Sequence, residues 1–224
     1  MRHRIPEGQQ YLFGSEAPVL SPAPATVTRT ASSSDVRDVV RDVVRRLERV
    51  AMMLHGGRTE VFQAFLEALD ALAAGGDDAP EVQEQGQPQR ELRAAAQAVA
   101  DLAKHTFEDA LGPIYMQFGH SKGGLGQFFT PWSIASMMAR LQLPPDGALP
   151  ASRPFRIADT SCGAGIMLLA AADALPADFL AAAGAEFTGI DIDPVCAEMT
   201  RLNLAIHGLG QWSRVICGDA LQML

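Results

Sequence analysis

The chain has 224 residues, 48% of them hydrophobic and 20% charged, and its 18 basic and 26 acidic side chains give a formal net charge of −8. This length and composition indicate one soluble globular domain with some additional chain, since domains typically hold roughly 100–200 residues. The acidic balance argues against a protein that grips nucleic acid over most of its surface, because phosphate binding needs clustered positive charge.

The sequence carries no evident membrane or secretion signal. No apolar run approaches the roughly 18 residues that a membrane helix needs, and the start, MRHRIPEGQQ, lacks the apolar core of a signal peptide. We therefore expect a cytoplasmic protein without a membrane partner. The cysteines, Cys162, Cys196 and Cys217, lie far apart in the sequence. Neither a disulfide framework nor a metal site is predicted from them.

Residues 1–34 are expected to form a disordered arm, because they combine several prolines and a serine run with little periodic hydrophobicity. Residues 35–118 are expected to form a helical domain, with helices over residues 35–54, 60–74 and 90–111. The serine run should cap the first helix and Thr59 the second. The predicted core positions are Val36, Val40, Val43, Leu47, Val50 and Leu54, then Val61, Phe65, Leu69 and Leu72, then Leu92, Val99, Leu102, Ala103 and Phe107.

Residues 119–152 are predicted to form a connector that contains the motif GQFFTP, followed by a helix over residues 132–141. Residues 153–224 then alternate between strand and helix patterns. Strands are predicted over residues 155–158, 187–190 and 214–217, and helices over residues 166–174 and 194–207. This alternation predicts a parallel sheet with crossover helices, and hence an α/β fold with part of a doubly wound, Rossmann-like domain.

The strongest local signal is the turn between the first strand and its helix, which runs from Asp159 through Ser161, Cys162 and Gly163 to Gly165. Glycines let backbone approach a ligand closely, and a helix N-terminus favours a carboxylate or phosphate. A nicotinamide fingerprint would require a third glycine where this chain has Leu168, and it does not require an acid at the strand end. An aminoacyl nucleoside fits better, with its ammonium paired to the acid and its carboxylate facing the turn amides.

The next two strands also end in acids. Asp191 follows the second strand, where a carboxylate can accept both hydroxyls of a ribose. Asp219 follows the third strand, in position to accept a hydrogen bond from an exocyclic amine. Because parallel strands end at one edge of a sheet, the three carboxylates should share one crevice. Each acid taken alone could equally be a capping residue, as Asp193 is expected to be at the start of the helix over residues 194–207.

Together, these motifs resemble those of the N6-adenine DNA methylases. The matching segments are residues 126–131 (GQFFTP), 159–165 (DTSCGAG), 189–194 (GIDIDP) and 218–221 (GDAL). More narrowly, the chain resembles the methylation subunits of type I restriction-modification systems and their phage and plasmid relatives. The likeness covers about residues 105–224. It implies a Rossmann-like fold that binds S-adenosylmethionine (SAM) and takes part in DNA methylation, with DNA and either a specificity subunit or a second copy of the chain as partners.

The resemblance assigns roles to individual residues. Thr130, Asp159 and the turn from Gly163 to Gly165 would contact the methionine part of SAM, Asp191 its ribose and Asp219 its adenine amine. The other implied cofactor residues are Phe128, Pro131, Ser161, Cys162, Ile192 and Ala220. The pair Thr130-Pro131 has a second interpretation, as an N-cap and first-turn proline that need no ligand.

One family motif is missing. The family methylates with an Asn/Asp-Pro-Pro-aromatic loop after the fourth strand, which binds the target amine of a flipped base. The pair Pro144-Pro145 follows Leu143 and precedes the first strand, so it does not match, and no catalytic residue is assigned. We expect the chain to be catalytically silent alone, with the edge of its first strand unpaired. The alternatives are a non-catalytic SAM-binding or interaction protein of a restriction-modification system and a methyltransferase acting on another substrate.

Overall fold

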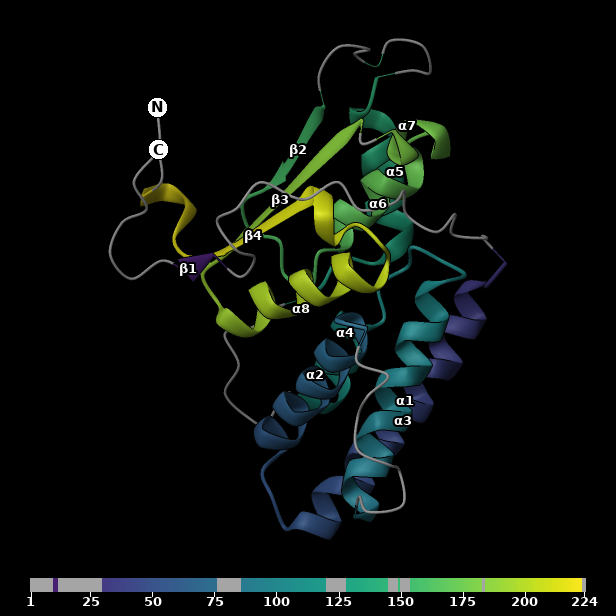
Figure 1. Cartoon of the computed structure of the whole chain (residues 1–224), viewed down its shortest axis with the longest axis vertical. Helices are drawn as coiled ribbons and strands as arrows, with labels where there is room; N and C mark the ends of the chain where they lie inside the picture. The colour runs from purple at the N-terminus through teal and green to yellow at the C-terminus, as the bar shows by residue number, and fades with distance from the viewer. Residues whose placement is uncertain are drawn as a thin grey trace. The chain divides into compact units, whose positions relative to one another are not determined.

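A computed structural model describes residues 10–11, 30–75, 86–119, 128–144, 149, 154–182 and 184–222. The chain divides into two compact units (Figure 1). Residues 27–129 form the helical unit, and residues 1–26 together with 130–224 form the α/β unit. Residues 120–127 of the predicted connector lie outside the described residues.

The helical unit consists of α1 (Ser33–Leu54), α2 (Arg58–Ala73), α3 (Gln87–Ala103) and the short α4 (Leu111–Ile114), which continues into a π-helical turn, η1 (Tyr115–Gly119). Helices α1 and α3 run side by side along most of their length (Figure 1). A capping box starts α1: Ser32 Oγ accepts from the Asp35 amide, and the Asp35 carboxylate accepts from the Ser32 amide at 2.7 Å. The predicted serine cap is therefore confirmed.

Most of the predicted apolar stripes form the core of this unit. The residues that are buried as expected are Val36, Val40, Val43, Leu47, Val50, Val61, Phe65, Leu69, Leu92, Val99, Leu102, Ala103 and Phe107. Leu54 is instead 51% exposed, because α1 ends there and the next residue, His55, takes a left-handed conformation at φ 49°. Leu72, near the end of α2, is only half-buried.

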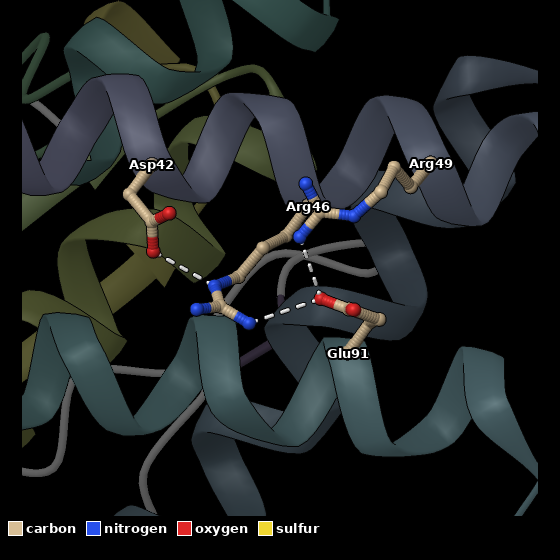
Figure 2. A network of polar contacts seen from close by, with 4 residues as sticks. All are labelled: Asp42, Arg46, Arg49 and Glu91. Carbon is tan, nitrogen blue, oxygen red and sulfur yellow. Dashed lines mark hydrogen bonds and ion pairs between the residues drawn. The ribbon is translucent and has the colours of Figure 1, made fainter.

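Arginines on the polar side of α1 are paired to acids, two of them across the helix interface (Figure 2). Glu91 of α3 accepts from Arg46 and from Arg49 of α1, each at 3.0 Å. Arg46 also donates to Asp42, one turn earlier, at 2.7 Å. The pKa of Glu91 is lowered, mainly because the Arg49 guanidinium donates to its carboxylate. This network holds α1 and α3 together at their polar margin.

Two further predictions about this unit are wrong. The third helix ends at Ala103 rather than at residue 111, because polar side chains downstream bond the backbone instead. The buried Asp109 carboxylate accepts from the amides of Leu111 and Gly112, at 2.8 and 3.1 Å, which starts α4. The second helix is capped by Gly57 and not by Thr59, which lies inside the helix.

The α/β unit alternates helices and strands as expected. It contains α5 (Trp132–Gln142), β2 (Phe155–Asp159), α6 (Ile166–Ala174), α7 (Ala177–Ala181), β3 (Ala185–Asp191), α8 (Pro194–Ile206), β4 (Ser213–Cys217) and the 3-10 turns η2 (Gly210–Trp212) and η3 (Ala220–Gln222). Strands β2 and β3 pair in parallel, as do β3 and β4. The expected Rossmann-like α/β fold class is confirmed by this parallel sheet with its crossover helices. The short helix α7 was not predicted.

A fourth strand comes from the arm that was expected to be disordered. Residues Gln10–Tyr11 form β1, which pairs antiparallel with the last two residues of β4. The sheet order is thus β1-β4-β3-β2 (Figure 1). A two-residue strand is stabilised almost entirely by the edge that it covers, so local sequence does not predict it. In the described part of the chain, β2 pairs only with β3, which leaves its other edge open as expected.

Candidate functional site

The carboxyl ends of three parallel strands meet at one edge of the sheet. Asp159, the last residue of β2, lies in register with Gly189 of β3, and Asp191 lies in register with Cys217 of β4. Strand β3 therefore extends two residues beyond the end of β2, and Asp219 follows two residues after the end of β4. The structure brings these predicted acids to the same edge, which is where ligands bind in open α/β sheets.

A single loop, residues 159–165, holds the first two acids in place. The Ser161 amide donates to the Asp159 carboxylate at 3.1 Å. The Gly163 amide donates to one oxygen of Asp191 at 2.8 Å, and the Asp193 amide donates to the other at 3.0 Å. Both oxygens of Asp191 are thus oriented by backbone amides. Each retains a lone pair for a further donor, such as a ligand hydroxyl.

These contacts revise the expected use of the loop. The Cys162 amide donates to the carbonyl of Ile190 and the Gly165 amide to that of Cys162, so most loop amides serve the protein itself. A ligand carboxylate would instead have to meet the amide of Ala164 and the first amides of α6, which lack intrahelical partners.

The acids create a negative local potential. The pKa of Asp159 is raised, mainly by burial and also by the nearby Asp191 carboxylate, while the hydrogen bond from the Ser161 amide opposes this rise. Among the described residues, no lysine, arginine or histidine pairs with Asp159, Asp191 or Asp219. Partly desolvated carboxylates without a cationic partner favour a positively charged ligand.

Glycine is required at two points of this loop. Gly163 and Gly165 take left-handed conformations, with φ of 56° and 87°, which side chains disfavour. A Cβ on Gly165 would also lie 3.2 Å from two side-chain atoms of Thr200. The sequence analysis predicted that these glycines let the backbone approach a ligand. The structure adds that Gly165 lets helix α8 approach the loop from the side of Thr200.

The end of β4 carries Asp219 and the start of η3. The Asp219 carboxylate accepts from the amide of Leu221 and from the side chain of Gln222, both at 3.0 Å. This acid therefore caps the following turn, which was the alternative interpretation of each strand-end acid, and capping leaves lone pairs for a ligand. Ala220 is half-buried beside it, and Ile192 at the end of β3 is 70% exposed.

The remaining predicted residues lie elsewhere along the chain. Pro131 is the N-cap of α5 and Thr130 precedes it, so the interpretation of Thr130 as the helix cap is wrong. Phe128 belongs to the helical unit and is 87% exposed. Its neighbour Phe129 packs edge-on against Tyr115 of the same unit, with ring centroids 6.0 Å apart. Within the described part of the α/β unit, neither Thr130 nor Pro131 makes a hydrogen bond to the loop that holds the acids.

A cavity of about 280 Å³ adjoins Asp159 on the side of α5 and α6. Its lining combines Ile157 and Asp159 of β2, Met138 of α5, and Met167 and Leu168 of α6. The cavity is therefore mostly apolar with one acid at its edge. Small-molecule sites commonly have this character, with few polar groups that fix the ligand's orientation.

Two polar residues of α8 were missed by the sequence analysis. Thr200 and Asn203 are both 0% exposed, and their side chains donate to the loop carbonyls of Gly163 and Ala164, at 2.8 and 2.7 Å. The available signal was a pair of polar residues on the otherwise apolar, inward face of α8.

The described helices include none long and apolar enough to cross a membrane. The same residues contain no cluster of histidine, cysteine or acidic side chains that could hold a metal ion.

Comparison with known proteins found a family model and a solved structure that are similar to this chain. The family model for N-6 DNA methylases matches residues 102–223. A crystal structure from Listeria monocytogenes, described as a class I S-adenosylmethionine-dependent methyltransferase, is similar at 13% sequence identity and a TM-score of 0.48. That match covers 79% of this chain and 51% of the other protein, so the chain spans about half the length of its structural relative.

Proposed function

Because this chain belongs to the N-6 DNA methylase family, we propose that its α/β unit binds SAM for methyl transfer to the N6 amine of adenine in DNA. The observation that carries this proposal is the arrangement of Asp159 and Asp191. One loop orients both carboxylates at the strand ends, and neither has a basic partner among the described residues. A cationic nucleoside would supply both the positive charge and the hydroxyl donors that these carboxylates can accept.

The residues present fit the chemical parts of SAM. Asp159, whose ionised form is destabilised by burial, would pair with the ammonium group. Asp191 would accept the ribose hydroxyls on the lone pairs that backbone amides leave free. The exposed Ile192 would pack against the adenine ring, with Asp219 and Ala220 at its exocyclic amine. Ser161, Cys162, Gly163 and Gly165 shape the loop at the methionine part, and Phe128, Thr130 and Pro131 are assigned to this part by family resemblance alone.

When bound, SAM supplies a methyl group activated by a positively charged sulfur. The chain's own residues would bind and orient the cofactor and shield it from water. The target amine needs a hydrogen-bond acceptor and an aromatic platform, which the family takes from an Asn/Asp-Pro-Pro-aromatic loop. These 224 residues contain no such loop, so another sequence would have to supply it. We therefore expect no methyl transfer by these residues alone.

DNA would be held with help from another polypeptide or domain, since the net charge of −8 disfavours phosphate binding by this chain. The family resemblance makes a specificity subunit or a second copy of the chain the expected helper. In that setting the protein would act in restriction-modification, in the cytoplasm.

A second candidate function is non-catalytic: a SAM-binding protein that joins a restriction-modification complex. It rests on the same strand-end acids, which would bind SAM in either case. The two candidates predict the same cofactor site and differ only in whether a partner restores transfer.

The proposed function is tested with labelled SAM and unmethylated DNA. The purified chain should be stabilised against heat by SAM, because a ligand that binds only the folded state raises the melting temperature. It should transfer no label to DNA by itself. Label transfer by the isolated chain would contradict catalytic silence, and an unchanged melting temperature at millimolar SAM would contradict the cofactor site. The Asp191→Ala variant serves as the control in both measurements.

A further inference from the structure

We propose that Thr200 and Asn203 of α8 are positioning residues for the cofactor loop, holding it in the conformation that receives the amino-acid part of SAM. This inference rests on the proposed function. Both side chains are fully buried, yet each directs a hydrogen bond to the loop backbone. Thr200 Oγ1 donates to the Gly163 carbonyl at 2.8 Å and Asn203 Nδ2 to the Ala164 carbonyl at 2.7 Å.

The loop needs such external bonds because its own residues do not restrict it. Gly163 and Gly165 have access to a wide range of backbone conformations, and both take positive φ here. The two donors act on successive carbonyls between these glycines. They therefore select one conformation at the part of the loop that is least constrained by local sequence.

The packing around Thr200 is close on two sides. A Cβ on Gly165 would lie 3.2 Å from Thr200, and a Cβ on Gly189 of β3 would lie 3.0 Å from the Thr200 methyl group. The hydroxyl also lies 3.3 Å from Cys162 Sγ. Burial raises the pKa of the Cys162 thiol to about 12, so the sulfur stays protonated and uncharged beside the hydroxyl at neutral pH. Thr200 thus fills the space between loop, strand and helix, and its hydroxyl proton is directed to the carbonyl.

Gly163 connects α8 to Asp191, the acid proposed to bind the ribose. The carbonyl of Gly163 accepts from Thr200, and its amide donates to Asp191 at 2.8 Å. Both peptide groups that flank the Gly163 Cα are therefore fixed from outside the loop, one by a helix and one by the acid. A change at position 200 should disturb first the loop segment that follows Gly163, which faces the amino-acid part of the ligand.

The test compares two ligands: SAM, and 5′-methylthioadenosine, which keeps the nucleoside but lacks the amino-acid part. Thr200→Val preserves the shape of the side chain and removes its donor. Its affinity for SAM should fall about tenfold, a loss typical of one buried hydrogen bond. Its affinity for methylthioadenosine should fall much less, so the ratio of the two affinities drops. Thr200→Ser keeps the hydroxyl and should restore the wild-type ratio.

Asn203→Leu, which breaks the second bond at similar volume, should lower the same ratio and provides the test if Thr200→Val does not fold. Equal weakening of both ligands, or a lowered melting temperature with an unchanged ratio, would show a merely structural role and overturn the inference. Wild-type chain that binds neither ligand would instead overturn the proposed function, and the inference with it.

Discussion

Two sets of charged residues, one in each unit, are arranged in opposite ways. In the helical unit, Glu91 binds Arg46 and Arg49, and Arg46 also binds Asp42, so the charges of this network neutralise one another (Figure 2). At the strand ends of the α/β unit, Asp159 and Asp191 are held only by backbone amides. Charges satisfied within the protein indicate a structural role, whereas oriented acids without a cationic partner indicate a ligand site.

Among substitutions in the α/β unit, that of Asp191, the acid proposed to bind the ribose, should lower SAM affinity most. Asp191→Ala removes the acceptor of the Gly163 amide and would remove the two proposed hydrogen bonds to the ribose of SAM. Because hydrogen bonds to a charged group contribute about 1.5–3 kcal/mol each, SAM affinity should fall about 100-fold or more. Isothermal calorimetry measures this change. Equal affinities for wild type and variant would show that the crevice is assigned wrongly.

Acid titration should reveal the role of Asp159. Its pKa lies above the ordinary 3.8, and an ammonium ligand would lower it, so SAM should bind more tightly as pH rises through this raised value. In the free protein the sign is opposite. Because the pKa of Asp159 is higher in the folded than in the unfolded protein, protonation of this carboxyl stabilises the folded state. The contribution is complete below pH 3.8 and is lost as pH rises through the raised pKa.

Asp159→Asn should bind SAM about tenfold more weakly at neutral pH and should lose both pH dependences, because the amide does not titrate. Calorimetry measures the pH dependence of SAM affinity, and thermal unfolding measures that of stability. Both are recorded over roughly pH 3.5 to 7, from near the ordinary aspartate pKa to neutrality. If the SAM affinity of Asp159→Asn depended on pH as that of the wild type does, a group other than Asp159 would be responsible for the titration.

Loss of the third acid should have a smaller effect on binding. The Asp219 carboxylate is shared with its own turn, where it accepts from Leu221 and Gln222. Asp219→Ala should weaken SAM about threefold to tenfold, because this carboxylate is shared with two donors of its own turn and offers only one hydrogen bond to the adenine amine. Asp219→Asn keeps an acceptor and should weaken it less. A loss as large as that of Asp191→Ala would contradict this ranking.

Disruption of the helical network should leave cofactor binding unchanged. Glu91→Ala removes the shared partner of Arg46 and Arg49, whose side chains are 28% and 42% exposed, so the free energy of unfolding should fall by about 1 kcal/mol. Chemical denaturation measures this loss, and Glu91→Gln should retain part of the stability. A clear change in SAM affinity would show that the helical unit contributes to the site.

Much of the α/β unit could be predicted because its boundaries are set by local chemistry. Helix α6 begins at Ile166, directly after Gly165, and Asp193 caps α8, accepting from the Val195 amide at 2.9 Å, as the sequence indicated. The third helix was extended too far because Phe107 and Leu111 continue the helical spacing, while the bonds from Asp109 to the backbone depend on three-dimensional folding. Helix α7 was missed because five residues give too little periodic signal.

The candidate site shows the same division. The three acids were found because each ends a strand pattern, and the sheet register then places them at one edge. Thr200 was missed because its partner is a backbone carbonyl 37 residues away, which no local pattern encodes. The destination of the Gly163 amide was also unpredictable, since it depends on how far Asp191 extends beyond Asp159 along neighbouring strands.

We propose that the strand-end acids Asp159, Asp191 and Asp219 form a working SAM site. The most direct measurement is calorimetric titration of the whole chain with SAM and, in parallel, with NAD, which lacks an amino-acid part. We expect saturable binding of SAM with one site per chain, and no binding of NAD at the same concentrations. A folded chain that binds neither, or that binds NAD in preference, would contradict a SAM site at these acids.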